Sequence, residues 1–195
     1  MSKDMLAMIE TMNQKSLEVQ LALQCAPVLT GIKVANLLII EKNTAQSLPE
    51  LLGDEKFAYR LLYERKNKLV YLIYNRDKLL EYMEIKEVTV LLKFFGYKDN
   101  SLENILNEIS CRYESYMSGC GDFPHELGLL LGYPVEDVLG FIHHQGQNFL
   151  YTGYWKVYGN LEQAKLLFEA FDKAQERAVI TIYQGNSIKT IVNAG

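Results

Sequence analysis

The sequence predicts an α+β fold in which a small antiparallel sheet of about four strands is covered by helices. The clearest sign is a β-hairpin, because two aromatic and aliphatic runs, 57–65 and 68–75, are separated by a short polar turn. A β-branched apolar run at 35–41 and an alternating run at 153–158 predict two more strands. Short turns between strands favour antiparallel pairing over crossovers.

The rest of the chain carries apolar residues at helical spacing. The second helix should end near Ala26, because Pro27 disfavours helical geometry in the residue before it. The tail at 179–192 fits either a strand or a helix. Helices are expected at 4–13, 16–25, 47–52, 76–83, 86–95, after Ser101, at 124–131 and 134–145, and after Asn160.

Proline and glycine organise the carboxyl-terminal part. Pro124 and Pro134 stand where first helical residues belong, and Gly132 and Gly146 stand where helix ends belong. We therefore expect two short helices in tandem.

Length and composition indicate one folded domain. A chain of 195 residues that is 49% hydrophobic and 23% charged can bury a core without disulfides or metal. We expect a single domain over 1–195. The alternative is a subdivision into 1–110, with helices and the hairpin, and 120–195, which is rich in glycine and aromatic residues.

Location and thiol chemistry follow from simple patterns. The first residues lack the basic start and apolar core of a signal peptide, which predicts a cytoplasmic protein. No apolar run approaches the length of a membrane span, so no membrane partner is expected.

The three cysteines, Cys25, Cys111 and Cys120, match no disulfide or zinc spacing and should be reduced thiols. Cys120 lies between two glycines, where it could be exposed and reactive.

The charge distribution argues against nucleic acid as a partner. The net charge is −4, and no Lys or Arg occurs between Tyr113 and Trp155, although the tandem helices superficially resemble a helix-turn-helix. The sequence also lacks a phosphate loop and the common dinucleotide, hydrolase and metalloprotease motifs. It leaves the cofactor and the oligomeric state open.

Several separated motifs are similar to those of one family. They are Phe-Pro-His-Glu-Leu-Gly at 123–128, Leu-Gly-Tyr-Pro at 131–134, Gly-Tyr-Trp-Lys-Val-Tyr at 153–158, and Cys-Ala-Pro-Val-Leu-Thr-Gly-Ile-Lys at 25–33. Together they resemble the uncharacterised bacterial family called domain of unknown function thirty-seven-ninety-three. The resemblance covers nearly the whole chain and implies no activity, because the family has none established.

The first candidate site is His125 with Glu126. At a helix start, the positive end of the helix favours an anion and a neutral imidazole. One hypothesis is an enzyme in which His125 is the general base, Glu126 or Asp137 orients it, and Cys120 is the nucleophile. The structural alternative is that Glu126 only neutralises the helix end. A metal site through His125 and His143 or His144 is a further hypothesis, but no known zinc spacing supports it.

The second candidate is the dense aromatic cluster at 123–158, which could line a pocket for a flat ligand such as a flavin or porphyrin, or simply form core. Trp155 and Tyr154 should face opposite ways. Our leading hypothesis is a non-enzymatic small-ligand-binding or accessory protein, and whether the protein is an enzyme stays open. The expected ligand-binding residues are Phe123, Pro124, His125, Glu126, Tyr133, Tyr154 and Trp155.

The junction at 123–126 yields the most specific expectation. Pro124 should begin a helix whose free amides, with His125, face the 153–158 strand. These amides would then form a site for an anion or carboxylate.

Overall fold

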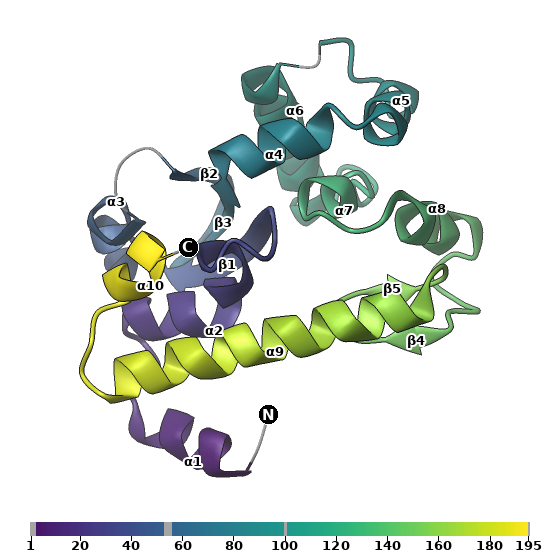
Figure 1. Ribbon diagram of the computed structural model, residues 1–195. Coiled ribbons are helices and arrows are strands. Elements are labelled where there is room, and N and C mark those ends of the chain that lie inside the picture. The colour runs from purple at the N-terminus through teal and green to yellow at the C-terminus, as the bar shows by residue number, and fades with distance from the viewer. Residues whose placement is uncertain (1–2, 53–55, 100, 195) are drawn as a thin grey trace. The chain divides into compact units, whose positions relative to one another are not determined.

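The computed structural model describes residues 3–52, 56–99 and 101–194 (Figure 1). Their contacts divide the chain into two compact units, 1–76 with 170–195 and 77–169. The subdivision expected between 110 and 120 falls inside the second unit. The elements in chain order are α1 (Lys3–Thr11), α2 (Leu17–Leu29), β1 (Ala35–Glu41), η1 (Lys42–Ser47), α3 (Leu48–Leu52), β2 (Phe57–Arg65), β3 (Lys68–Asn75), α4 (Arg76–Met83), α5 (Lys86–Phe94), α6 (Leu102–Met117), α7 (Leu127–Leu130), α8 (Val135–His143), β4 (Tyr151–Thr152), β5 (Lys156–Val157), α9 (Leu161–Tyr183) and α10 (Lys189–Ala194).

The first unit contains a three-stranded antiparallel sheet in the order β1-β3-β2. Its three strands have the predicted bounds, and the hairpin pairs Arg65 with Lys68 across its turn. In β1 the pairing with β3 runs from Ala35 opposite Tyr74 to Glu41 opposite Lys68. The α+β fold class is therefore confirmed.

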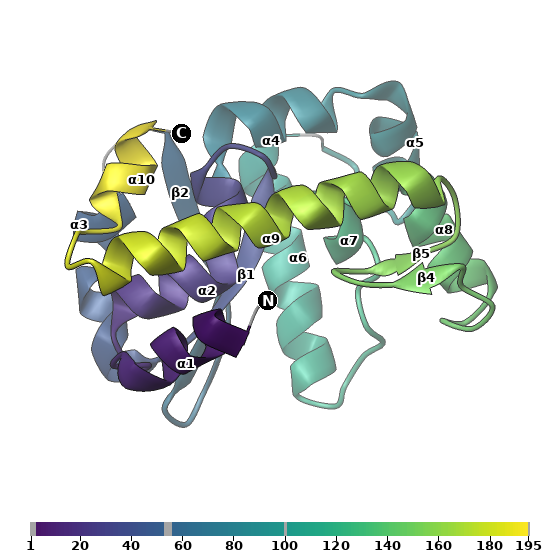
Figure 2. The same ribbon diagram turned by 60° about the horizontal axis from the view of Figure 1, so that its bottom comes forward.

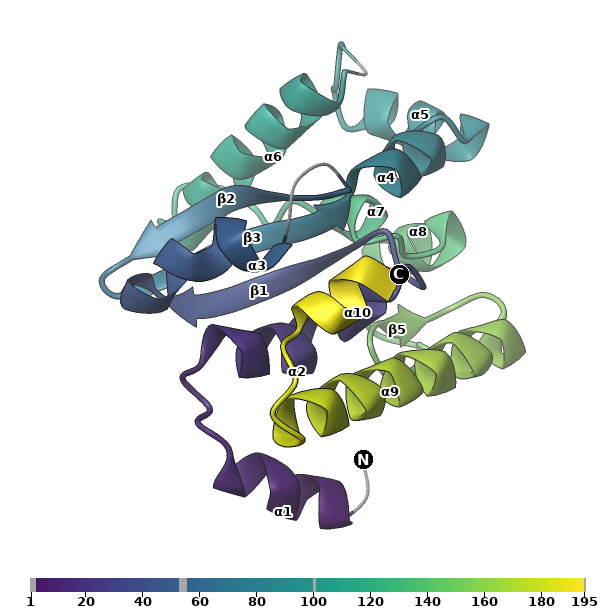
Figure 3. The same cartoon turned by 60° about the vertical axis from the view of Figure 1, so that its left-hand side comes forward.

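The core of the first unit lies between this sheet and α2 (Figure 3). Leu38 and Ile40 alternate with more exposed residues in β1 and join the buried cluster that α2 contributes. The expected end of α2 near Ala26 is wrong, because the helix continues through Pro27 to Leu29. Val28 and Leu29 are fully buried, and burying them outweighs the local preference of the residue before proline.

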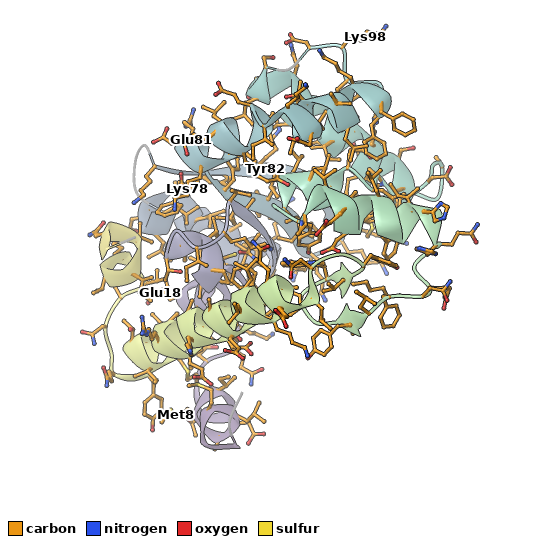
Figure 4. The ribbon with its side chains drawn as sticks, turned by 45° about the vertical axis from the view of Figure 1, so that its right-hand side comes forward. Met8, Glu18, Lys78, Glu81, Tyr82 and Lys98 are labelled. Atoms are coloured by element: carbon orange, nitrogen blue, oxygen red, sulfur yellow. The ribbon has the colours of Figure 1, made fainter. Side chains whose placement is uncertain are left out.

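The carboxyl-terminal tail, which the sequence left undecided, is helical. Residues 170–183 of α9 run along α2 (Figures 1 and 2), and the Gln175 side chain donates to the Leu23 carbonyl at 2.6 Å. Ala174 and Ala178, one turn apart, are both buried in the core. Before α10, Glu18 (Figure 4) accepts hydrogen bonds from the Ser187 hydroxyl at 2.6 Å and the Ile188 amide at 3.0 Å.

The second unit comprises α4 after its first residue, α5 to α8, the β4-β5 pair and the start of α9. The prediction that 153–158 forms a fourth strand of this sheet is wrong. Only Lys156–Val157 is a strand, and it pairs with β4 in a separate two-stranded sheet. A tight turn, in which the Gly153 amide donates to the Trp155 carbonyl at 3.0 Å, interrupts the segment. Gly132 and Gly146 have positive φ, as expected of residues that end helices.

Tyr82 on α4 (Figure 4) ties that helix to the segment between α7 and α8, because its hydroxyl donates to the Tyr133 carbonyl at 2.8 Å. Burial raises the pKa of Tyr82 to about 12, so the hydroxyl keeps its proton and remains a donor. None of the helices in the described ranges is long and apolar enough to cross a membrane.

Candidate functional site

The candidate residues all lie in the second unit, between α6 and the start of α9. The junction at 123–126 does not begin a long helix. α7 starts at Leu127 and has four residues, so the predicted helix at 124–131 is shorter than expected. The Leu127 amide donates to the Pro124 carbonyl and the Gly128 amide to the His125 carbonyl, each at 3.0 Å. The amides of Leu127 and Gly128 are thus used by bonds within the turn and do not contribute to the expected anion site.

Glu126 is buried and belongs to a polar cluster. Its Oε1 accepts from Arg112 Nη1 at 2.7 Å and from the Tyr97 hydroxyl at 3.2 Å. Arg112 also donates to the Phe95 carbonyl at 2.9 Å and to Glu108 at 2.8 Å, and its guanidinium lies 4.6 Å from the Tyr97 ring centroid. Glu126 thus holds the start of α7 to α6 and to the end of α5.

Asp137 on α8 is the second buried carboxylate, with 3% of its surface exposed. Its Oδ2 accepts from the indole nitrogen of Trp155 at 2.7 Å, and its Oδ1 accepts from the amides of Tyr158 at 2.7 Å and Gly159 at 2.9 Å. Gly140, one turn later, lets the backbone of α8 approach this segment, since a Cβ there would lie 2.5 Å from the Tyr158 Cβ. Asp137 therefore anchors β5 and the residues after it to α8.

The aromatic cluster divides into a buried part and an exposed part. In the buried part Trp155 stacks on Tyr133, with ring centroids 4.9 Å apart, and meets Phe168 edge-on at 4.5 Å. Tyr154 is exposed and Trp155 is buried, as expected for neighbours in an extended segment. Gly153 permits the close packing, because a Cβ there would overlap the Phe168 ring.

The exposed part is a continuous series of side-chain contacts that we call the aromatic row. Tyr116 meets Phe123 at 5.2 Å between centroids, and the His125 ring lies 5.5 Å from both Phe123 and Phe141. Lys156 Nζ then lies 5.7 Å from the Phe141 centroid and 4.9 Å from that of Phe149. The row comprises Tyr116, Phe123, His125, Phe141, Phe149 and Lys156.

The row is accessible and carries a cation, and its neighbouring rings meet edge-on or tilted. Tyr116, Phe123 and Phe149 are exposed, while His125, Phe141 and Lys156 are half-buried. Lys156 is fixed by donating to the Gly146 carbonyl at 2.7 Å. The face of an individual exposed ring beside an ammonium group suits a planar ligand that carries negative charge.

The remaining candidates are dispersed. Cys120 is exposed, as expected, and its thiol contacts the Ser118 carbonyl at 3.8 Å. The His143 and His144 rings lie 4.7 Å apart, and His144 stacks on Tyr158 at 5.6 Å. Within the described ranges no three His, Cys, Asp or Glu side chains are grouped to hold a metal ion.

The comparison with known families settles the family of the chain. The family model described as "Protein of unknown function (DUF3793)" matches residues 21–192. The chain belongs to this family. No curated protein and no solved structure matches it.

In this DUF3793 protein, sequence reasoning placed Phe123 and His125 in the site but missed Lys156 and Arg112. Lys156 could have been noticed in the sequence, because it is the first Lys or Arg after a long stretch that has none and because aromatic residues surround it. Arg112 gave no such signal, since its partner Glu126 is 14 residues away in sequence.

Proposed function

We propose that the protein is a non-enzymatic binder of a small planar ligand with an anionic group, and that the ligand lies on the aromatic row. The observation that carries this proposal is the unbroken series of ring contacts from Tyr116 to Phe141, continued by Lys156 to Phe149. Stacking on exposed rings stabilises a flat ligand, and the ammonium of Lys156 complements a phosphate or carboxylate.

We favour binding over catalysis because the two carboxylates that were expected to orient His125 have other hydrogen-bond partners. Glu126 accepts from Arg112 and Tyr97, and Asp137 accepts from Trp155 and two backbone amides. A general base is normally oriented by a hydrogen bond from a third group. The described contacts of the His125 ring are with Phe123 and Phe141, which suits a stacking surface.

The test measures thermal shift and calorimetric affinity with flavin mononucleotide, riboflavin and haem. Flavin mononucleotide and riboflavin share a ring system, but only flavin mononucleotide has a phosphate. Lys156→Met should therefore lower the affinity for flavin mononucleotide more than the affinity for riboflavin. Phe123→Ala and His125→Ala should each lower affinity about tenfold, the loss expected for one stacking contact, with little change in melting temperature.

Phe94→Ala is the matched control, because Phe94 is 79% exposed on α5 and lies outside the row. Its affinity should equal that of the unmodified protein. Equal losses in Phe94→Ala and Phe123→Ala, or no response to any of the three compounds, would count against the proposal.

A further inference from the structure

A second apolar surface lies on α5, a helix that contributes no residue to the aromatic row. The buried side chains of this helix are Val88, Leu91 and Leu92. Val90 and Phe94 lie one turn apart on the opposite side of the helix, where they are 59% and 79% exposed. The Phe94 ring meets the Phe95 ring edge-on, with centroids 5.7 Å apart. α5 thus presents two large apolar side chains outward, and an exposed apolar patch rimmed by polar residues is typical of an interaction site.

Charged residues rim this face of α5. Lys86, Glu87 and Lys93 are exposed, and within the described ranges none of the three side chains has a hydrogen-bond or ion-pair partner. A helix turns by about 100° per residue, so Lys86 and Lys93 flank Val90 on one side. Glu87 and Phe94 flank Val90 on the other side. One flank of the face is therefore basic, and the other flank is acidic and aromatic.

We propose that this face binds a second copy of the chain, with the two α5 helices parallel and Val90 at the two-fold axis. In a parallel pair related by a two-fold axis, the basic flank of each helix meets the acidic and aromatic flank of the other. Glu87 then forms an ion pair with the partner's Lys86. One turn further along the axis, the ammonium group of the partner's Lys93 lies over the Phe94 ring. The symmetry repeats both contacts on the other side of the axis.

The charges select both the occupant and its orientation. In an antiparallel pair like flanks would meet, so Lys86 would face the partner's Lys93 and the two ammonium groups would repel each other. The parallel pair instead gives each unpartnered charge on α5 a complementary group. The interface is small, because α5 has nine residues and a standard interface buries about 800 Å² on each partner. We therefore expect a reversible dimer with a dissociation constant on the order of 100 µM.

The test is sedimentation equilibrium of the full-length protein from about 10 µM to about 1 mM, a range that brackets the expected constant. Lys86→Glu and Glu87→Lys each place like charges opposite each other at both symmetric contacts, so each variant alone should dimerise about tenfold more weakly. An equimolar mixture of the two variants should dimerise as tightly as the unmodified protein, because both contacts of the mixed dimer then join opposite charges. Phe94→Ala should also weaken the dimer at least about tenfold.

Glu169→Lys is the matched control, because it makes the same charge change as Glu87→Lys at an exposed position on α9. It should dimerise like the unmodified protein. An unmodified protein that stays monomeric at the highest concentration would overturn the proposal, and so would a mixture of the two charge variants that associates no better than either alone. Tighter association of Lys86→Glu would indicate the antiparallel pair and would overturn it as well. Dimerisation and ligand binding to the aromatic row are measured separately, so either proposal can fail without the other.

Discussion

Replacing Asp137 by asparagine should destabilise the second unit through one identifiable contact. The amide oxygen of the new side chain could still accept from the backbone amides of Tyr158 and Gly159. Its NH2 group would then replace Oδ2, which accepts from the Trp155 indole at 2.7 Å. The new NH2 group and the indole N–H are both donors, and they would face each other in a buried site, because Asp137 is only 3% exposed.

The magnitude can be worked from this geometry. A hydrogen bond to a charged acceptor contributes about 1.5–3 kcal/mol, and leaving the indole N–H unpaired adds part of its desolvation cost. We therefore expect Asp137→Asn to lower the free energy of unfolding by about 3 kcal/mol. Asp137→Ala should cost more, about 4–5 kcal/mol, because it orphans all three donors and leaves a cavity.

The assay is urea unfolding followed by tryptophan fluorescence. Trp155 is the single tryptophan, so the signal reports on the contact itself. Glu136→Gln is the matched control, since Glu136 is exposed and accepts from the Asn160 amide at 3.1 Å, which a glutamine oxygen can also do. The control should stay within about 0.5 kcal/mol of the unmodified protein. An Asp137→Asn protein as stable as this control, with unchanged emission, would refute the reasoning.

Three further substitutions test other contacts. Arg112→Met should cost about 3–5 kcal/mol by leaving the buried Glu126 charge unpaired, and adding Glu126→Gln should restore part of the loss in a double-mutant cycle of melting temperatures. Lys33 has a lowered pKa in the folded state, so the unfolded chain binds more protons between pH 8 and 10.5 and stability should rise there by about 3 kcal/mol. Lys33→Met should abolish that rise in urea midpoints measured at pH 7.5 and 10. Gly153→Ala should cost about 1–3 kcal/mol through its contact with Phe168, and Phe168→Leu should reduce that cost.

The sheet of the first unit was predictable because local and tertiary preferences agree there. β1, β2 and β3 are rich in residues with high β-propensity, and a short turn joins β2 to β3. The 153–158 segment has the same propensity but forms no long strand. Asp137 accepts from the Tyr158 amide at the end of the segment and from the Gly159 amide just after it. Such a competitor, more than twenty residues away, cannot be seen in local sequence.

The candidate site was predictable in composition but not in arrangement. The density of aromatic residues was visible, and so was the opposite facing of Tyr154 and Trp155. Which rings stay exposed depends on tertiary contacts, for example the burial of Trp155 between Tyr133 and Phe168. For the same reason, the sequence could not reveal that Glu126 pairs with Arg112.

The placement of charge is the strongest physical link between this fold and the proposed function. The two buried carboxylates, Glu126 and Asp137, are engaged by donors within the second unit and so hold its helices and β5 together. Lys156 places an ammonium group beside the rings of Phe141 and Phe149, and under the proposed function this group favours an anionic ligand. A neutral planar compound should therefore bind through stacking alone, with the same affinity for the unmodified protein and for Lys156→Met. The phosphorylated form of the compound should bind Lys156→Met more weakly than the unmodified protein. Added salt should weaken the binding of the phosphorylated compound only, because salt screens the charge interaction and leaves the ring contacts unchanged.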